Sequence, residues 1–398
     1  MNAIKKNKSY NFPLMINNIS KADLALVISH LKKKNPMLTQ SENVNKFEKF
    51  WSNWLGVKYS VFVNSGSSAN LLSMSVLRQL YKKNEVIVPS LTWVSDISSV
   101  LQNNLKPVFV DINMKNLCMD EDKILKSINS KTLAVFITYA QGFNGLSKKL
   151  LSELKKRKIH LIEDVCESHG AKFNNKKLGS FGLMSNFSFY YAHHMSTIEG
   201  GIVSTNNKKV YQMLRLMRSH GMVRESNDKS FKKLYINKHK DLNEKFIFAY
   251  PSYNLRSTEI NAIIGINQLK SLDENIIKRN INHNIFLKHI NKEKFFTDFD
   301  LKGSSNYAFN LILRKPNNKF AKKLMKAMDL AGVEYRRGSA GGGNQLRQPY
   351  LKILFPKKYH LNYPITDHIH FYGFYLGNYP SLSKQKILKL CKIINSVK

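Results

Sequence analysis

Acidic residues are scarce in this sequence. Its 398 residues contain 27 Asp and Glu against 63 Lys and Arg, which gives a formal net charge of +36. Such an excess can indicate a nucleic-acid partner, but the lysines are spread along the whole chain, without an arginine-rich tail or a basic run interleaved with aromatic residues. We therefore expect no nucleic-acid binding. The positive field would instead attract an anionic, nucleotide-linked small molecule.

Cysteine and long apolar runs are also scarce. The three cysteines, Cys118, Cys166 and Cys391, lack the CxxC spacing of metal and iron–sulfur sites and do not suggest a disulfide framework. No apolar run reaches the ~18 residues that a membrane span needs, and the lysine-rich start lacks the apolar core of a secretory signal. We expect a protein of the reducing cytoplasm, with no metal site and no membrane partner.

The first half of the chain shows a regular alternation of strands and helices. Hydrophobic residues make up 43% of the sequence, which is typical of a globular protein, and the length favours two domains over one. This alternation predicts an α/β fold with a mostly parallel sheet, in which ligands bind at the carboxyl ends of the strands. The predicted strands are 59–65, 85–90, 106–112, 132–139 and 160–165, and the helices between them are 67–81, 94–102, 120–128 and 148–158.

The second half of the chain shows a different pattern of helices and strands. A proline-free segment from 258 to about 290 predicts one long helix that links two domains. Beyond it, strands at 306–314 and 333–337 and helices at 318–331 and 383–396 indicate a smaller α+β domain. We therefore expect a large domain over residues 1–290 and a small C-terminal domain over residues 291–398.

A small-residue loop, VNSGSSANL (63–71), joins a predicted strand to a predicted helix. It puts Gly66 and Ser67 at the helix start, where backbone N–H groups and the helix dipole can hold a phosphate. Glycine also lets the backbone approach a ligand closely. Serine-rich helix caps are common, so the loop by itself is a weak indication of a phosphate site.

Two further stretches carry side chains suited to chemistry. HLIEDVCESHGA (160–171) ends a predicted strand in Asp164, which by itself could simply cap a helix. NFSFYYAHHMSTIEGGIVST (186–205) places His193 and His194 in a polar turn between two strands. On the dipeptide alone, a solvated turn without a function is the more ordinary interpretation.

These three stretches, in this order, resemble the DegT/DnrJ/EryC1/StrS sugar aminotransferases, a family of fold-type I pyridoxal phosphate enzymes. The resemblance covers most of the chain and implies an aspartate aminotransferase-like fold: a large domain with a mostly parallel seven-stranded sheet and a smaller α+β domain. In that family, the turn of 186–205 carries a lysine that binds the cofactor covalently. In this sequence His193 stands at that position, and we take His194 as structural.

The resemblance also implies which residues hold pyridoxal 5′-phosphate (PLP) or its amine form, pyridoxamine 5′-phosphate (PMP). A carboxylate beside the ring nitrogen keeps the ring protonated, which makes the ring an electron sink. The implied cofactor residues are Gly66, Ser67 and Ser188 at the phosphate, Trp93 stacked on the ring, Asp164 at the ring nitrogen, Glu167 at the ring hydroxyl, and Asn254 reaching the phosphate of a neighbouring subunit. The functional unit is therefore expected to be a homodimer.

The histidine at position 193 changes the expected chemistry. It cannot hold the cofactor covalently, so PMP becomes the natural resting form, but it can still transfer protons near neutral pH. The resemblance then implies a 3-dehydratase with His193 as the catalytic residue. The enzyme would remove the C3 hydroxyl of a nucleotide-linked 4-keto-6-deoxy sugar, with GDP-4-keto-6-deoxy-D-mannose as the expected substrate. L-glutamate would regenerate PMP, with release of ammonia and 2-oxoglutarate.

Substrate contacts are implied for His220, Arg224 and Arg336. Arg336 begins a basic, glycine-rich loop suited to a diphosphate. The expected pathway is the biosynthesis of a deoxysugar such as colitose for the O-antigen of lipopolysaccharide. The sequence leaves open GDP or CDP as the base, and which arginine binds the diphosphate.

Two other functions compete with this interpretation. An ordinary sugar-nucleotide aminotransferase would need a lysine at the cofactor position, which this sequence lacks. A catalytically idle cofactor-binding or regulatory protein would have no reason to keep Asp164, Trp93, Ser188 and a titratable His193. A 3-dehydratase that draws electrons from an iron–sulfur cluster is disfavoured by the scattered cysteines.

Overall fold

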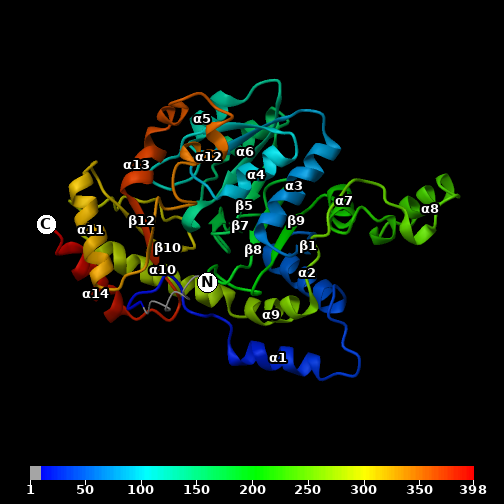
Figure 1. The fold of residues 1–398 in the computed structure, drawn as a ribbon, viewed down its shortest axis with the longest axis horizontal. Helices are drawn as coiled ribbons and strands as arrows, with labels where there is room; N and C mark the ends of the chain where they lie inside the picture. The colour runs from blue at the N-terminus through cyan, green and yellow to red at the C-terminus, as the bar shows by residue number, and fades with distance from the viewer. Residues whose placement is uncertain (1–9) are drawn as a thin grey trace, which may run out of the picture.

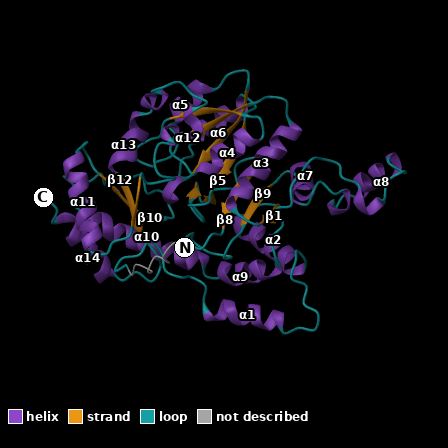
Figure 2. Ribbon diagram, in the orientation of Figure 1, coloured by secondary structure: helices purple, strands orange, loops and turns teal. Residues whose placement is uncertain are grey.

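The computed structural model describes residues 10–398. A seven-stranded sheet forms the centre of the molecule, and a smaller sheet lies to one side of it (Figure 1, Figure 2). The order of the large sheet is β1-β9-β8-β5-β4-β2-β3, and β9 alone runs antiparallel to its neighbours. The strands are β1 (Tyr59–Val63), β2 (Glu85–Pro89), β3 (Lys106–Val110), β4 (Thr132–Thr138), β5 (His160–Asp164), β8 (Met184–Ser188) and β9 (Gly201–Thr205). The predicted α/β fold is confirmed.

Helices cover both faces of this sheet because successive strand residues point to opposite sides. In β1, Phe62 packs with the core under α2, while Val61 packs with the core under α3. The helices are α1 (Lys21–Leu31), α2 (Glu42–Leu55), α3 (Gly66–Leu80), α4 (Val94–Gln102), α5 (Glu121–Ser127), α6 (Lys148–Lys156) and α7 (Lys208–Arg218). The bounds of the predicted helices follow the sequence periodicity closely. Ser20 caps α1, because its hydroxyl accepts a hydrogen bond from the Asp23 backbone N–H.

The prediction of one continuous helix from 258 to 290 was wrong, because the segment forms two helices. The structure divides it into α9 (Glu259–Leu269) and α10 (Leu272–His289), with Lys270 and Ser271 between them. Apolar periodicity runs through both pieces, and no proline or glycine marks the break, so the sequence carried no signal for it. The division lets α9 pack on α2 while α10 packs on α14 (Lys384–Asn395).

The smaller sheet is antiparallel, with the order β10-β12-β11. Its strands are β10 (Ala308–Ile312), β11 (Tyr335–Arg337) and β12 (Gly373–Gly377), and the later helices are α11 (Asn318–Leu330), α12 (Pro349–Lys352) and α13 (Pro364–Tyr372). The N-terminal segment joins this domain, because Phe12 forms a bridge with Val333 beside β11. The division into 1–290 and 291–398 stays a prediction.

A helical arm extends from the large domain. It contains α8 (Lys229–Lys238) and short 3-10 turns at Val223–Glu225 and Glu244–Phe246, and it projects away from both sheets (Figure 1). The remaining strands, β6 (Lys172–Phe173) and β7 (Lys176–Lys177), form a small hairpin. Within residues 10–398, no helix combines the length and the apolar character that a membrane crossing requires.

Candidate functional site

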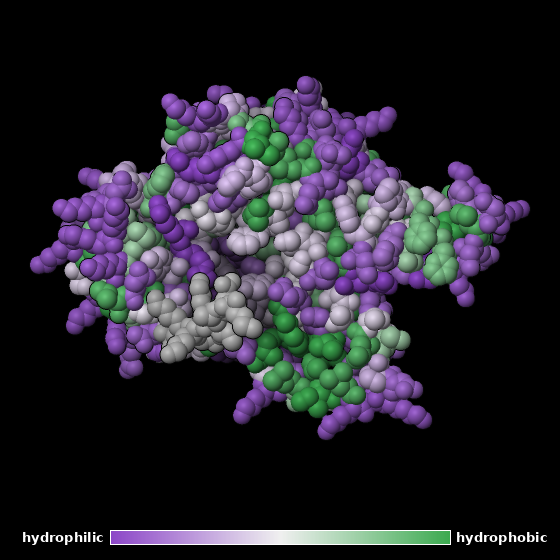
Figure 3. Space-filling view, in the orientation of Figure 1, coloured by the Kyte–Doolittle hydropathy of each residue, from purple (hydrophilic) through white to green (hydrophobic). Residues whose placement is uncertain are grey.

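A cavity of about 490 Å³ lies where the carboxyl ends of the large sheet meet the small domain. The space-filling view is hollowed in this central region (Figure 3). The cavity takes residues from the loops after β1, β2, β5 and β8, as expected for a ligand site in an α/β fold. Eight residues predicted from the sequence line it together: Gly66, Ser67, Trp93, Asp164, Glu167, Ser188, His193 and Arg336.

One corner of the cavity suits a phosphate group. Helix α3 begins there, with Ser65 as its cap, and the backbone N–H groups of Gly66 and Ser67 have no hydrogen-bond partner within the described part of the chain. A Cβ atom at Gly66 would lie 2.4 Å from the Cβ of Ser188, so only glycine fits this approach of helix and strand. Free N–H groups at a helix start beside the Ser188 hydroxyl form a cradle for an anion.

The next wall of the cavity carries two carboxyl groups. Asp164 ends β5 with a side chain 4% exposed, and it accepts hydrogen bonds from the Cys166 backbone N–H at 2.9 Å and from Asn70 Nδ2 at 3.0 Å. Burial raises the pKa of Glu167 to about 7, although the backbone N–H of Gln141 donates to it at 2.9 Å. Glu167 can therefore donate or accept a proton at neutral pH. Trp93, 58% exposed at the N-cap of α4, lines the same cavity.

His193 lies in the turn between β8 and β9, where its backbone N–H bonds to the Tyr190 carbonyl at 3.0 Å. Burial, followed by the charge of Arg279, lowers the pKa of the imidazole to about 3. The ring is therefore neutral at physiological pH and can accept a proton. Its Nδ1 atom has no hydrogen-bond partner among the described residues.

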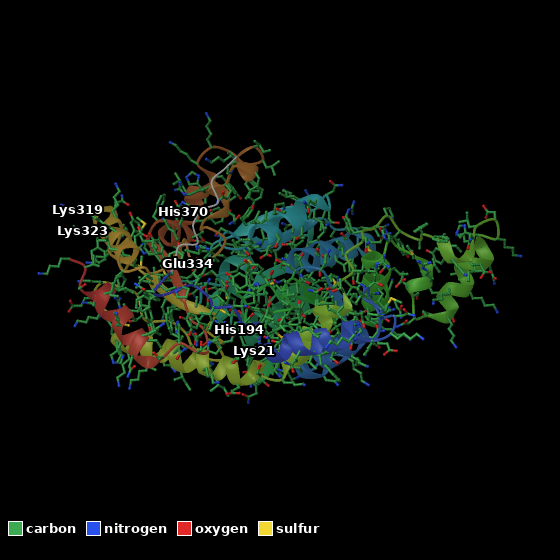
Figure 4. The ribbon with its side chains drawn as sticks, turned by 60° about the horizontal axis from the view of Figure 1, so that its bottom comes forward. Lys21, His194, Lys319, Lys323, Glu334 and His370 are labelled. Atoms are coloured by element: carbon green, nitrogen blue, oxygen red, sulfur yellow. The ribbon has the colours of Figure 1, made fainter. Side chains whose placement is uncertain are left out.

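The second histidine of the pair has a different environment. His194 is 2% exposed, and its Nε2 bonds to the carbonyl of Ser305 at 3.1 Å. It does not line the cavity. Figure 4 shows it away from Lys319 and Lys323, which lie on α11 at the outside of the molecule. This position fits the structural role expected for it.

Arg279 of α10 is a buried cation on the cavity wall. It is 1% exposed, and its Nη1 donates to the backbone carbonyls of Tyr307, at 2.8 Å, and Asn378. No carboxylate pairs with it within residues 10–398. Sequence analysis missed this residue, because a lone arginine in a helix has no distinguishing pattern. Burial is the main reason why the charged forms of His193 and His194 are disfavoured, and the charge of Arg279 adds to it.

The small domain closes the cavity from the other side. Glu334 accepts a hydrogen bond from the Leu14 backbone N–H at 2.9 Å and pairs with Arg336 at 3.3 Å. Arg337 lies beside Arg336 on β11 and also lines the cavity. The sequence had suggested an arginine contact here, but it offered no sign that Leu14 and Met15 would lie opposite. Further lining residues that sequence analysis missed are Ser95, Thr138, Tyr190, Tyr191, Glu199, Tyr307 and Tyr375.

Three predicted site residues lie outside the cavity of their own chain. His220, Arg224 and Asn254 are grouped at the base of the arm, where Ser219 and Asn254 form a bridge. Asn254 is exposed, and its Oδ1 accepts a hydrogen bond from Arg256 Nε at 3.0 Å. Their roles in a site remain predictions that require a second copy of the chain.

The residues of the cavity suit a cofactor rather than a metal ion. Within residues 10–398, no group of three or more His, Cys, Asp and Glu side chains is arranged to hold a metal. The anion cradle, the ring wall and the carboxylate of Asp164 instead fit the phosphate, the pyridine ring and the ring nitrogen of PLP or PMP.

Comparison with known proteins gives a consistent result. The chain is 33% identical over 393 residues to the GDP-4-keto-6-deoxy-D-mannose 3-dehydratase of Yersinia pseudotuberculosis, covering 96% of this chain and 98% of that protein. It is 32% identical over 375 residues to the protein of the same name from Escherichia coli O55:H7, covering 93% and 95%. A crystal structure of GDP-4-keto-6-deoxymannose-3-dehydratase with a trapped PLP-glutamate geminal diamine superposes with a TM-score of 0.87 at 30% identity, covering 96% and 100%.

The match to a family model is equally extensive. The model of the DegT/DnrJ/EryC1/StrS aminotransferase family matches residues 18–395. This range is nearly the whole chain and includes every predicted site residue. This chain belongs to the DegT/DnrJ/EryC1/StrS aminotransferase family.

Proposed function

We propose that this protein is a PLP/PMP-dependent 3-dehydratase, a carbon–oxygen lyase that removes the C3 hydroxyl of a nucleotide-linked 4-keto-6-deoxy sugar. Two relatives, from Escherichia coli O55:H7 and Yersinia pseudotuberculosis, are named GDP-4-keto-6-deoxy-D-mannose 3-dehydratase. We therefore expect GDP-4-keto-6-deoxy-D-mannose as the substrate. The observation that carries the proposal is His193, a neutral imidazole on the cavity wall where an aminotransferase of this family has lysine. No lysine lines the cavity among the described residues, which disfavours the aminotransferase alternative.

The chain supplies a separate group for each part of the cofactor. Gly66, Ser67 and Ser188 would hold the phosphate, and Trp93 would cover one face of the ring. Asp164 would pair with the ring nitrogen, and Glu167 would contact the ring hydroxyl. When bound, the cofactor supplies an amine that condenses with the 4-keto group and a ring that accepts the electron pair released at C4′.

His193 would provide the proton transfers. As a neutral base it would remove a proton from C4′, and as the resulting acid it would protonate the C3 hydroxyl as that group leaves. Burial, and then the nearby charge of Arg279, which no carboxylate offsets among the described residues, favour the return of the imidazole to its neutral form. On the opposite wall, Arg336 and Arg337 would bind the diphosphate of the nucleotide.

The overall reaction balances with glutamate as the reductant. Replacing the C3–OH of the sugar by C3–H takes up two electrons, and converting glutamate to 2-oxoglutarate and ammonia releases two. The equation is 4-keto-6-deoxy sugar plus glutamate to 3-deoxy-4-keto sugar, 2-oxoglutarate and ammonia. An iron–sulfur partner is therefore not needed for this reaction.

The test is a product assay with purified protein, PMP and GDP-4-keto-6-deoxy-D-mannose. With glutamate present, ammonia and 2-oxoglutarate should form in equal amounts. Without glutamate, we expect turnover to stop after about one equivalent per site, because each turnover leaves the cofactor without its amino group. Sustained dehydration without an amino donor, or dependence on a reductase and NADH, would contradict the proposal. Formation of an amino sugar would support the aminotransferase instead.

We also propose that the enzyme acts as a homodimer. His220, Arg224 and Asn254 lie together outside their own cavity, so a role in catalysis requires them to enter a neighbour's site. The arm beside them exposes apolar side chains that a partner would cover. These are Leu234, Leu242, Phe246 and Phe248. The expected cytoplasmic location also remains a proposal, which the three free cysteines support.

A further inference from the structure

A second aspartate lies directly behind the carboxylate assigned to the ring nitrogen. Asp96 belongs to the first turn of α4, has an exposed fraction of 0%, and does not line the cavity. One amide group touches both acids: Asn70 Nδ2 lies 2.6 Å from Asp96 Oδ1 and 3.0 Å from Asp164 Oδ2. The same amide nitrogen therefore lies between the two carboxyl groups, and the charge of one acts on the other.

Among residues 10–398, no cation balances these two acids. The side chains that donate to Asp96 are neutral: Asn70, Thr92, and Thr138, whose Oγ1 lies 2.6 Å from Oδ2. Neither aspartate forms an ion pair with a lysine, arginine or histidine within residues 10–398. Two adjacent buried carboxylates without a counter-ion cannot both remain charged, so the pair retains one proton.

The surroundings decide which acid keeps that proton. Asp164 lines the cavity and accepts a hydrogen bond from the Cys166 backbone N–H. This hydrogen bond stabilises a negative charge on the Asp164 carboxylate. Asp96 is completely enclosed, and burial followed by the charge of Asp164 raises its pKa well above the usual range. Asp96 is therefore the neutral member, and its O–H can donate to Asp164.

We propose that Asp96 is a positioning residue that, as a neutral carboxylic acid, donates a hydrogen bond to Asp164 and holds the single negative charge of the pair at the cavity wall. The charge then faces the place of the ring nitrogen, where it keeps that nitrogen protonated. This inference rests on the proposed function only for the identity of the ring. The sharing of the proton is a property of the chain itself.

The other titratable groups near Asp96 leave this arrangement unchanged around neutral pH. Cys166 follows β5, and burial and the charge of Asp164 raise the pKa of its thiol well above its usual range. Tyr350 of α12 is also affected, because burial and then Asp96 raise the pKa of its phenol. Both groups are neutral at physiological pH, so the single charge of the aspartate pair persists there.

The first test uses the protein without cofactor. Infrared spectroscopy at about pH 8 should show the carbonyl band of a buried carboxylic acid, because an ordinary aspartate would be fully ionised there. Asp96→Asn should remove that band. Glu167→Gln is the matched control, because it removes another acid of the same cavity whose pKa of about 7 leaves it mostly ionised at pH 8, so the band should stay in place. A wild-type protein without the band, or a band that survives in Asp96→Asn, would overturn the proposal.

The second test measures PMP binding and the protonation of its ring nitrogen by ¹⁵N NMR. Asp96→Ala should weaken binding about tenfold and lower the protonated fraction, because Asp164 loses its donor. Asp96→Asn retains a donor, so binding should stay within about twofold of wild type. Asp96→Leu, which also lacks a donor, replaces Asp96→Ala if the latter does not fold. Unchanged binding and protonation in Asp96→Ala would overturn the positioning role. If wild-type protein binds no PMP, the proposed function fails, while the infrared test still decides the state of Asp96.

Discussion

Gly66 and Ser188 approach each other so closely that a single added carbon would not fit between them. A Cβ built on Gly66 would lie 2.4 Å from Ser188 Cβ and 2.9 Å from its Oγ. The first residue starts α3 and the second ends β8, two elements far apart in the sequence. Their contact places a hydroxyl and N–H groups that have no partner in the described part of the chain around one point, which is the arrangement that an anion requires.

This contact predicts a specific defect in Gly66→Ala. The new methyl group should push the start of α3 away from β8 and weaken PMP binding at least about tenfold, by disturbing several phosphate hydrogen bonds. Equilibrium binding measured by PMP fluorescence would quantify the loss. Ser188→Gly in the same chain removes the clashing atoms and should recover part of the affinity that Gly66→Ala loses. A Gly66→Ala protein with wild-type affinity would contradict the assignment of the phosphate corner.

A lysine at position 193 should restore the covalent link that the family uses. In His193→Lys we expect PLP to become attached to the chain, with the absorbance change of a cofactor–lysine bond, and dehydration to be lost because the neutral imidazole is gone. Borohydride followed by mass spectrometry would detect the attachment. The wild-type protein is the control and should carry no reduced cofactor. Dehydration by His193→Lys at the wild-type rate would show that His193 is not the base.

Mixed dimers can test whether Arg224 works in a neighbour's cavity. His193→Asn and Arg224→Ala chains should each be inactive alone. After unfolding and refolding together in equal amounts, half of the dimers are mixed and each has one intact site, so about a quarter of wild-type activity should return.

A mixture that remains inactive while mixed dimers are demonstrated would place Arg224 in its own chain's site or outside catalysis. Lys229→Ala is a suitable control partner, because this residue lies on the same arm, beyond the group at its base. When Lys229→Ala chains are mixed with His193→Asn chains, the sites in the Lys229→Ala chains should stay active, whichever chain they pair with.

Buried histidines should make the fold sensitive to acid. Burial lowers the pKa of His193 and His283 to about 3, and the pKa values of His169 and His194 lie well below the usual range for the same reason. Unfolded histidines titrate near pH 6.5, so below that pH the unfolded chain binds more protons and the free energy of unfolding falls. Each histidine contributes about 1.4 kcal/mol per pH unit down to its folded pKa. Urea denaturation at several pH values would measure the slope.

Two variants separate this effect from general acid denaturation. His283 contacts Phe143 and Phe309, and neither of its ring nitrogens has a partner among the described residues. His283→Phe should reduce the slope by the contribution of one histidine, whatever its effect on stability at neutral pH. His289→Gln, an exposed position on the same helix, should leave the slope unchanged. Equal slopes in wild type and His283→Phe would contradict the neutral state of that residue.

The sequence alone determined the features that depend on local patterns. Strand and helix periodicity identified the parallel sheet, and parallel strands bring the chain segments after them to one edge. For this reason Gly66, Trp93, Asp164 and Ser188, each close to the end of a strand, could be placed in a common site before the structure was known. His193 was recognisable because a single position in the family turn decides whether the cofactor is bound covalently.

Only the tertiary structure decided which residues complete the cavity. Leu14 comes to face Glu334 because the N-terminal segment runs beside β11, a pairing across more than three hundred residues that leaves no local signal. Asp96 and Asp164 meet because β2 and β5 both flank β4, and α4 follows β2 directly. The proton that they share depends on burial and on the absence of a counter-ion among the described residues. Both are consequences of packing, and neither can be read from the order of the amino acids.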